Sequence, residues 1–171
     1  MLLEILMYKY VITDSSNGCE VYVNLITSSA GHYLSRQPYV IKLTKEVLTR
    51  INLTGTKMTI ERSMGRVIGN TDIVETSEKD TIYYALPYKK NVFSRYAKNR
   101  YPLPSDKLTL ILEKDTDGNY ELADTWIGPF SPPFPGDANE TSKSRSYWET
   151  HALVQDAQVV QSKTITKICP Y

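Results

Sequence analysis

The chain has only two histidines, His32 and His151, and histidine is the side chain best suited to proton exchange near neutral pH. His32 lies in a loop that precedes a predicted helix, and His151 lies downstream of a proline-rich loop at residues 128–136. Asp137 follows that loop and could orient or pair with the His151 imidazole. Cleavage of RNA through its 2′-hydroxyl needs one group that takes a proton and another that gives one. The two histidines are candidates for these roles.

A basic and aromatic segment at residues 88–107 could bind the phosphates of a nucleic acid. Its cations outnumber its single acid, Asp106, which gives a local charge of about +5, enough to attract a phosphate backbone. Aromatic side chains between the cations could stack on unpaired bases. The candidate nucleic-acid contacts are Lys89, Lys90, Arg95, Tyr96, Lys98, Arg100 and Tyr101.

Each of these features also has a purely structural interpretation. A histidine that enters an apolar strand, as His151 does, is commonly a hydrogen-bonded structural residue. The basic segment could equally be a solvated helix face whose aromatic side chains point into the core. Val92 and Tyr96, four residues apart, could then lie on one side of that helix. The sequence therefore leaves open whether the protein is an enzyme.

The sequence predicts neither a metal nor a cofactor. Cys19 and Cys169 are far apart and lack a neighbouring histidine pair, so the spacing of a zinc site is absent. Acids at residues 113–124 resemble the pattern of a calcium loop, but a hairpin turn accounts for the same residues. The glycine-rich and catalytic motifs of common nucleotide-binding proteins, hydrolases and metalloproteases are absent.

The elements that would position these residues are mainly strands. Residues 107–113 and 120–127 flank an Asp-Gly turn and predict a β-hairpin, and residues 9–13 and 20–27 predict a second one. Alternating polarity also predicts strands at residues 57–62 and 81–86. Further short strands are expected at residues 66–68 and 71–75, around a turn at Gly69-Asn70, and at residues 152–154 and 158–168. Helices are expected at residues 45–52, with Thr44 as N-cap, at 142–150, and as a helical face within 88–100.

These elements predict an α+β fold, in which an antiparallel sheet of roughly five to seven strands carries two or three short helices. At 171 residues, the chain is expected to form a single domain spanning residues 1–171. No apolar run approaches the ~20 residues that a membrane helix requires. Two cysteines and the lack of a signal-peptide pattern predict a cytoplasmic protein without a membrane anchor.

About 70 C-terminal residues resemble small bacterial RNase toxins of the barnase, EndoU, colicin and RelE-like group. The resemblance covers Tyr101-Pro-Leu-Pro-Ser, the strand at residues 108–112, Asp117-Gly118, the strand at 120–127, the proline loop and the segment that ends at His151. In that group a strand of this kind carries an active-site Thr or Ser, and Thr125 matches the position. The resemblance implies RNA cleavage without a metal, and a neutralising protein partner.

The leading hypothesis is therefore an RNase-like phosphodiesterase that acts on RNA. His151 would be the general acid or base, Thr125 would lie beside the scissile group, and the cations Arg95, Lys98 and Arg100 would hold phosphate. The alternative is a non-enzymatic module that binds nucleic acid or protein through residues 88–107. A third interpretation is a small inhibitor or interaction protein that uses its tyrosine-rich strand edges. The sequence does not distinguish whether His32 and His151 share a site, and it leaves the oligomeric state open.

Overall fold

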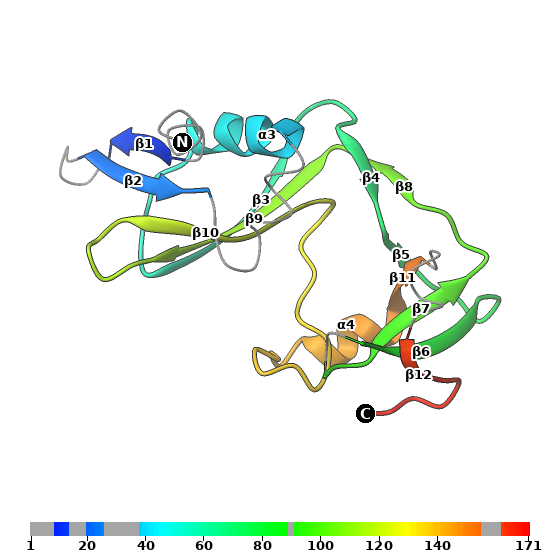
Figure 1. Cartoon of the computed structure of the whole chain (residues 1–171). Coiled ribbons are helices and arrows are strands. Elements are labelled where there is room, and N and C mark those ends of the chain that lie inside the picture. Colours follow the sequence, from blue (N-terminus) through cyan, green and yellow to red (C-terminus); the bar gives the residue numbers. More distant parts are fainter. Residues whose placement is uncertain (1–8, 14–19, 26–37, 89–90, 155–161) are drawn as a thin grey trace. The chain divides into compact units, whose positions relative to one another are not determined.

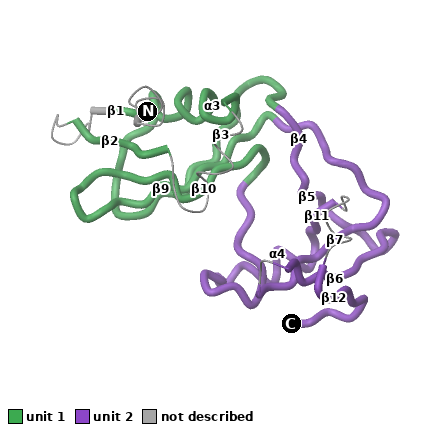
Figure 2. Tube along the Cα trace, viewed as in Figure 1, with its two compact units in different colours: residues 1–68, 106–129 green, residues 69–105, 130–171 purple. Residues whose placement is uncertain are grey.

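The computed structural model describes residues 9–13, 20–25, 38–88, 91–154 and 162–171 of the chain (Figure 1). The chain divides into two compact units, one formed by residues 1–68 and 106–129 and the other by residues 69–105 and 130–171 (Figure 2). Within the described residues, each unit has its own five-stranded sheet and its own helix.

The first unit is a five-stranded sheet with one helix, α3 (Pro38–Leu48). In spatial order its strands are β1 (Lys9–Thr13), β2 (Glu20–Asn24), β10 (Tyr120–Ile127), β9 (Lys107–Lys114) and β3 (Lys57–Ser63). Neighbouring strands are antiparallel except for β2 and β10, which are parallel. The side chains of Leu108, Leu110 and Leu112 on β9 are fully buried, because strand alternation places them on the same face. They form one core with Leu43, Val47 and other apolar side chains of α3.

The hairpin between β9 and β10 is held by the side chain of Asp115. Its Oδ1 accepts hydrogen bonds from the backbone N–H groups of Asp117 and Asn119, each at 2.9 Å. Gly118 completes the turn with a φ of +84°, a conformation that side chains with a Cβ adopt only at a cost. The predicted pairing of these two strands is thus confirmed, with a bulge between Leu122 and Asp124.

The second unit contains a five-stranded sheet, a two-stranded ribbon and helix α4 (Ser144–Thr150). In spatial order the sheet contains β12 (Ser162–Thr166), β6 (Thr81–Pro87), β7 (Ser94–Lys98), β11 (His151–Val154) and β5 (Ile73–Glu75). Strands β7 and β11 are parallel, and the other pairs are antiparallel. The ribbon pairs β4 (Gly69–Thr71) with β8 (Leu103–Ser105). Strand β11 begins directly where α4 ends, so the helix fixes where this strand starts.

The α+β class and the two helices found in the described residues confirm the predicted fold class. The prediction of a single antiparallel sheet is wrong. Two five-stranded sheets and a ribbon take its place, and each large sheet contains one parallel pair. A parallel pair joins strands that are distant in the chain, here β2 with β10 and β7 with β11, and local sequence patterns do not encode such pairings.

Most of the predicted elements are confirmed within a few residues. They are the strand pair β1–β2, the strands β3, β6, β9, β10 and β11, and the helix α4. Strand β12 covers the part of the predicted strand at residues 158–168 that the structure describes.

Three local predictions are wrong. Helix α3 begins at Pro38, not after Thr44, and the Thr44 hydroxyl donates to the carbonyl of Val40 inside the helix instead of capping it. Proline at the start of a helix is favoured, but the β-branched residues after it resemble a strand. Gly69-Asn70 is part of β4 and pairs with β8, so it is not a turn. Residues 66–68 are not a strand.

The segment that was expected to form a helical face within 88–100 is instead strand β7. The i, i+4 spacing of Val92 and Tyr96 suggested a helix, but β7 is paired on both sides, with β6 and with β11. Pairing on both edges outweighs a weak local helical pattern. The strand ends at Lys98, and the next residue, Asn99, has a φ of +59°. None of the helices in the described part of the chain is long and apolar enough to cross a membrane.

Candidate active site

His151 is fixed at the junction between α4 and β11 by an aromatic stack. Its imidazole lies parallel to the ring of Tyr147, with 4.0 Å between the ring centroids and 7° between the planes. Tyr147 in turn packs edge-on against Trp148, which is buried and stacks on Phe134 of the proline loop at 3.8 Å. The Trp148 indole N–H also donates to the carbonyl of Pro132 at 3.0 Å. The proline loop thus anchors the helix, and the end of the helix orients the histidine.

The hydrogen bonds of His151 indicate the tautomer of its imidazole. Nδ1 lies 3.0 Å from the carbonyl oxygen of Tyr147 and 2.9 Å from the hydroxyl of Thr150. A carbonyl oxygen only accepts hydrogen bonds, so we assign the proton of the neutral ring to Nδ1. Nε2, the nitrogen without a proton in this tautomer, makes no hydrogen bond to the described residues. A histidine held in one tautomer in this way is suited to acid–base chemistry.

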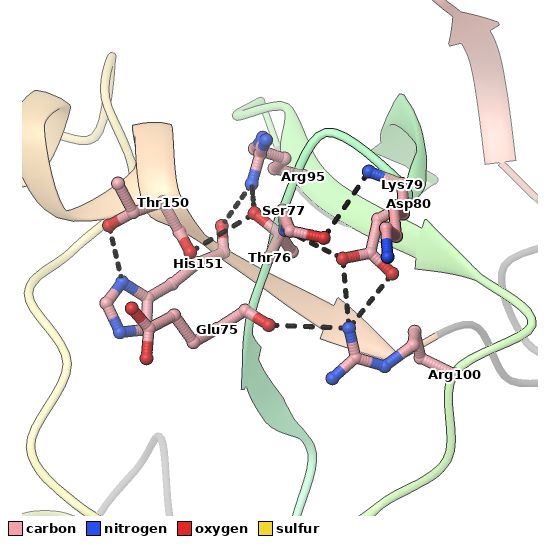
Figure 3. Close-up of polar contacts among 9 residues, drawn as sticks. All are labelled: Glu75, Thr76, Ser77, Lys79, Asp80, Arg95, Arg100, Thr150 and His151. Atoms are coloured by element: carbon pink, nitrogen blue, oxygen red, sulfur yellow. Dashed lines mark hydrogen bonds and ion pairs between the residues drawn. The ribbon is translucent and has the colours of Figure 1, made fainter.

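Glu75 is the cross-strand neighbour of His151. The two residues are paired in the antiparallel register of β5 and β11, which places their side chains on the same face of the sheet. Residues paired in this way have Cβ atoms roughly 5 Å apart. Figure 3 shows the Glu75 side chain extending toward the imidazole, and both residues are accessible to solvent, Glu75 more than His151. A carboxylate and an imidazole are therefore available together at the edge of the second unit's sheet.

A polar cluster, of which Arg95 is buried, fixes the backbone beneath this pair (Figure 3). The backbone N–H of Thr76 donates to the carbonyl of Thr150 at 2.8 Å, and its hydroxyl donates to the same oxygen at 3.1 Å. Arg95 reaches the cluster from β7, where its Nη1 donates to the Thr76 hydroxyl and to the His151 carbonyl, both at 2.9 Å. These bonds tie the end of β5 to the start of β11, so they hold Glu75 and His151 in register.

Arg100 lies beside Glu75 and is held by the turn that joins β5 to β6. Its Nη1 donates to both carboxylate oxygens of Asp80, at 2.9 and 3.0 Å, and lies 3.4 Å from the Glu75 carbonyl. The backbone N–H of Ser77 donates to Asp80 and, together with the Arg100 guanidinium, holds the pKa of Asp80 below its usual value of 3.8. Nε and Nη2 of Arg100 make no hydrogen bond within the described chain, so they are available to an anion.

Two of the other predicted catalytic residues, Thr125 and Asp137, have hydrogen-bond partners outside this cluster. Thr125 lies in the first unit, is 4% exposed, and its hydroxyl donates to the carbonyl of Thr109 on β9. Asp137 lies in the second unit, but its Oδ1 accepts a hydrogen bond from the backbone N–H of Asn139 and so holds the local turn. No hydrogen bond or ion pair joins Asp137 to His151 in the described chain. His32 lies outside the described residues.

The basic segment does not present its cations on one open face. Strand alternation separates Arg95, which is 9% exposed, from Tyr96 and Lys98 on the opposite face. Tyr96 stacks on Tyr83 of β6, with ring centroids 5.5 Å apart, while Lys98 is exposed. Tyr101 is 81% exposed. Lys89 and Lys90 lie outside the described residues.

Five residues of the cluster were not singled out from the sequence: Glu75, Thr76, Asp80, Tyr147 and Thr150. Tyr147 and Thr150 sit four residues and one residue before His151, and helical spacing alone could have suggested the first contact. Glu75 and Asp80 are unremarkable in sequence, because only the pairing of β5 with β11 brings Glu75 to the histidine.

Within the described ranges, no group of three or more His, Cys, Asp or Glu side chains is arranged to hold a metal ion. Glu75 and His151 therefore belong to no such group among the described residues. Comparison of the chain with protein-family models, curated proteins and solved structures finds no match.

Proposed function

We propose that the chain is an RNase-like phosphodiesterase that cleaves RNA without a metal, with Glu75 and His151 as its acid–base pair. The observation that carries the proposal is the cross-strand pairing of these two residues on one solvent-accessible face. Cleavage through the 2′-hydroxyl needs a proton acceptor and a proton donor close together, with a cation nearby for the phosphate. The second unit contains all three types, because Glu75 pairs with His151 across the strands and Arg100 contacts the Glu75 carbonyl.

The roles follow from the chemistry of each group. An ionised carboxylate only accepts hydrogen bonds, so Glu75 would take the proton from the 2′-hydroxyl as that oxygen attacks phosphorus. The protonated imidazole would give its Nε2 proton to the departing 5′-oxygen, while Nδ1–H stays bonded to the Tyr147 carbonyl. The products would be a 2′,3′-cyclic phosphate and a free 5′-hydroxyl. The free edge of Arg100 would stabilise the charge that builds up on the phosphoryl oxygens.

The test is cleavage of a mixed-sequence RNA oligonucleotide in the presence of EDTA, with detection of the cyclic phosphate product. Glu75→Gln and His151→Ala should each lower the cleavage rate by ~10²–10⁴-fold, as expected for a positioned acid or base. Glu78→Gln is the matched control, since Glu78 is an exposed acid in the neighbouring turn and its substitution changes the net charge as Glu75→Gln does. An inactive wild type, or wild-type rates in both site variants, would refute the proposal.

A second candidate function is binding of single-stranded nucleic acid without cleavage. It is favoured by the exposure of Tyr88 (64%) and Tyr101 (81%), which flank the accessible Lys98 in sequence. Exposed aromatic rings are suited to stacking on unpaired bases. Binding to a labelled RNA that persists in the Glu75→Gln and His151→Ala variants, with no cleavage by the wild type, would favour this function. The neutralising protein partner implied by the resemblance belongs to the nuclease proposal and would be lost with it.

A further inference from the structure

The charge of Arg95 is buried among apolar side chains. Arg95 lies on β7, the central strand of the second unit's sheet, and strand alternation places it on the same face as Ala97. Ala97 belongs to a buried cluster with Val74, Ala152 and Val154. Arg95 itself is 9% exposed. An ionised side chain in such surroundings needs a compensating partner of opposite charge.

The described residues do not supply that partner. Nη1 of Arg95 is bonded to two neutral oxygens, those of Thr76 and His151, and no described carboxylate forms an ion pair with the guanidinium. Nε of Arg95 is buried and has no hydrogen-bond partner among the described residues. A buried polar atom of this kind calls for an explanation, because unsatisfied donors in a protein interior are rare and costly.

Two tyrosines lie next to the same guanidinium. Tyr84 on β6 is the cross-strand partner of Arg95 and shares its face, and its ring meets that of Tyr171 edge-on at 5.7 Å. The hydroxyl of Tyr171 is also buried without a partner among the described residues. Burial raises the pKa of both phenols, and the charge of Arg95, which acts in the opposite direction, does not reverse this. Near neutral pH the phenols are therefore uncharged donors and cannot neutralise Arg95.

Among the described residues, Nε of Arg95 and the buried Tyr171 hydroxyl thus lack an acceptor, and the Tyr84 phenol interacts with the same guanidinium. Guanidinium and hydroxyl donors are the groups with which proteins bind phosphate-like oxyanions. We propose that Arg95, Tyr84 and Tyr171 form a buried binding site for a phosphate-sized oxyanion, on the sheet face opposite the His151 side chain. The site is independent of the proposed cleavage reaction, since Glu75 and His151 point to the other face.

The test uses inorganic phosphate as the probe, in buffers of matched ionic strength made with chloride. Phosphate should raise the Tm of the full chain in a saturable manner, and its ³¹P resonance should broaden on addition of protein. Tyr171→Phe and Tyr84→Phe remove one hydroxyl each and should weaken the phosphate affinity roughly tenfold, the effect of losing one hydrogen bond to a charged group. Arg95→Met should abolish saturable binding.

Two controls separate this site from its surroundings. Lys98→Gln removes an exposed cation from the same strand and should leave phosphate binding unchanged. His151→Ala should also leave it unchanged, so failure of the nuclease proposal does not affect this result. If Arg95→Met does not fold, the two Tyr→Phe variants still decide the question. Absence of a saturable response in the wild type, or wild-type affinity in both Tyr→Phe variants, would overturn the proposal and leave trapped water as the partner of these donors.

Discussion

The Nη1 atom of Arg95 lies 2.9 Å from the carbonyl oxygen of His151, so a buried arginine on β7 holds the first residue of β11. The same nitrogen reaches the hydroxyl of Thr76, which in turn donates to the carbonyl of Thr150. Three chain segments that are distant in sequence, at residues 76, 95 and 150–151, thus meet through one guanidinium and one hydroxyl. Such a network specifies a register more sharply than apolar packing, because each polar group in it requires its partner.

We therefore predict that Thr76→Val lowers the free energy of unfolding by about 1–3 kcal/mol. Valine matches the shape of threonine but removes the hydroxyl that accepts from Arg95 and donates to the Thr150 carbonyl, so the buried guanidinium loses one of the two hydrogen bonds of its Nη1. Urea unfolding followed by circular dichroism measures the change. Thr76→Ser is the control, since it keeps the hydroxyl and should be the more stable variant of the two. Equal stability of the two variants would contradict the importance of the hydroxyl.

The ion pair of Asp80 and Arg100 predicts a specific loss of stability in acid. The folded-state pKa of Asp80 lies below its ordinary value, because the Ser77 N–H and the Arg100 guanidinium favour the carboxylate. Its contribution to stability is therefore complete above the unfolded value of about 3.9, and it is lost as the pH falls through the folded pKa. In Asp80→Asn the Tm should be lower than wild type at pH 6, and the difference should shrink below pH 3. A constant difference across this range would contradict the assignment.

The turn of the β9–β10 hairpin gives a third prediction. At Gly118 the φ of +84° lies in the left-handed region, and an added Cβ would meet only the Lys114 side chain at 4.0 Å. The penalty for a side chain here comes from the backbone conformation and not from a clash. Gly118→Ala should cost about 1 kcal/mol, and Gly118→Asn should cost less, because asparagine tolerates this conformation better. Thermal unfolding of both variants checks the order.

The sequence was informative where a structure depends on neighbours in the chain. The hairpin at Asp115–Asn119 was predicted because alternation and an Asp-Gly turn occur together, and the helix that ends at Thr150 has its own local pattern. Strand β7 was predicted as a helix because its identity depends on pairing with β6 and β11. These partners are contributed by residues 81–87 and 151–154, and their pairing is a long-range property.

The residues of the candidate site were likewise predictable from the sequence only in part. His151 could be chosen from the sequence because histidine is scarce in the chain. Its partner Glu75 could not, because the chain has many acids and only the β5–β11 register selects this one. Arg95 was expected to hold phosphate at the surface. Side-chain alternation along β7 instead places it on a buried face of the sheet, where it donates to the backbone carbonyl of His151. The count of charges in a segment says nothing about which face each one occupies.

The burial of Arg95 and the exposure of Lys98 on the same strand lead to a final prediction on nucleic-acid binding. If the protein binds single-stranded RNA through residues 88–107, each phosphate contact contributes ~0.7 to the slope of log affinity against log salt concentration. Lys98 is exposed, so Lys98→Gln should reduce the slope by about this amount. Arg95 is 9% exposed and bonded to Thr76 and His151, so a polymer cannot reach it and Arg95→Gln should leave the slope unchanged wherever the fold persists.

Lys143→Gln is the matched control, because Lys143 is an exposed lysine of the same unit that lies outside the basic segment. Fluorescence anisotropy with a labelled RNA at several salt concentrations measures all three slopes. A smaller slope for Arg95→Gln than for Lys98→Gln would mean that the buried arginine is exposed to RNA in solution. Equal slopes for Lys98→Gln, Lys143→Gln and the wild type would instead remove this segment as the nucleic-acid contact, because an exposed cation at the interface has to release its share of counterions on binding.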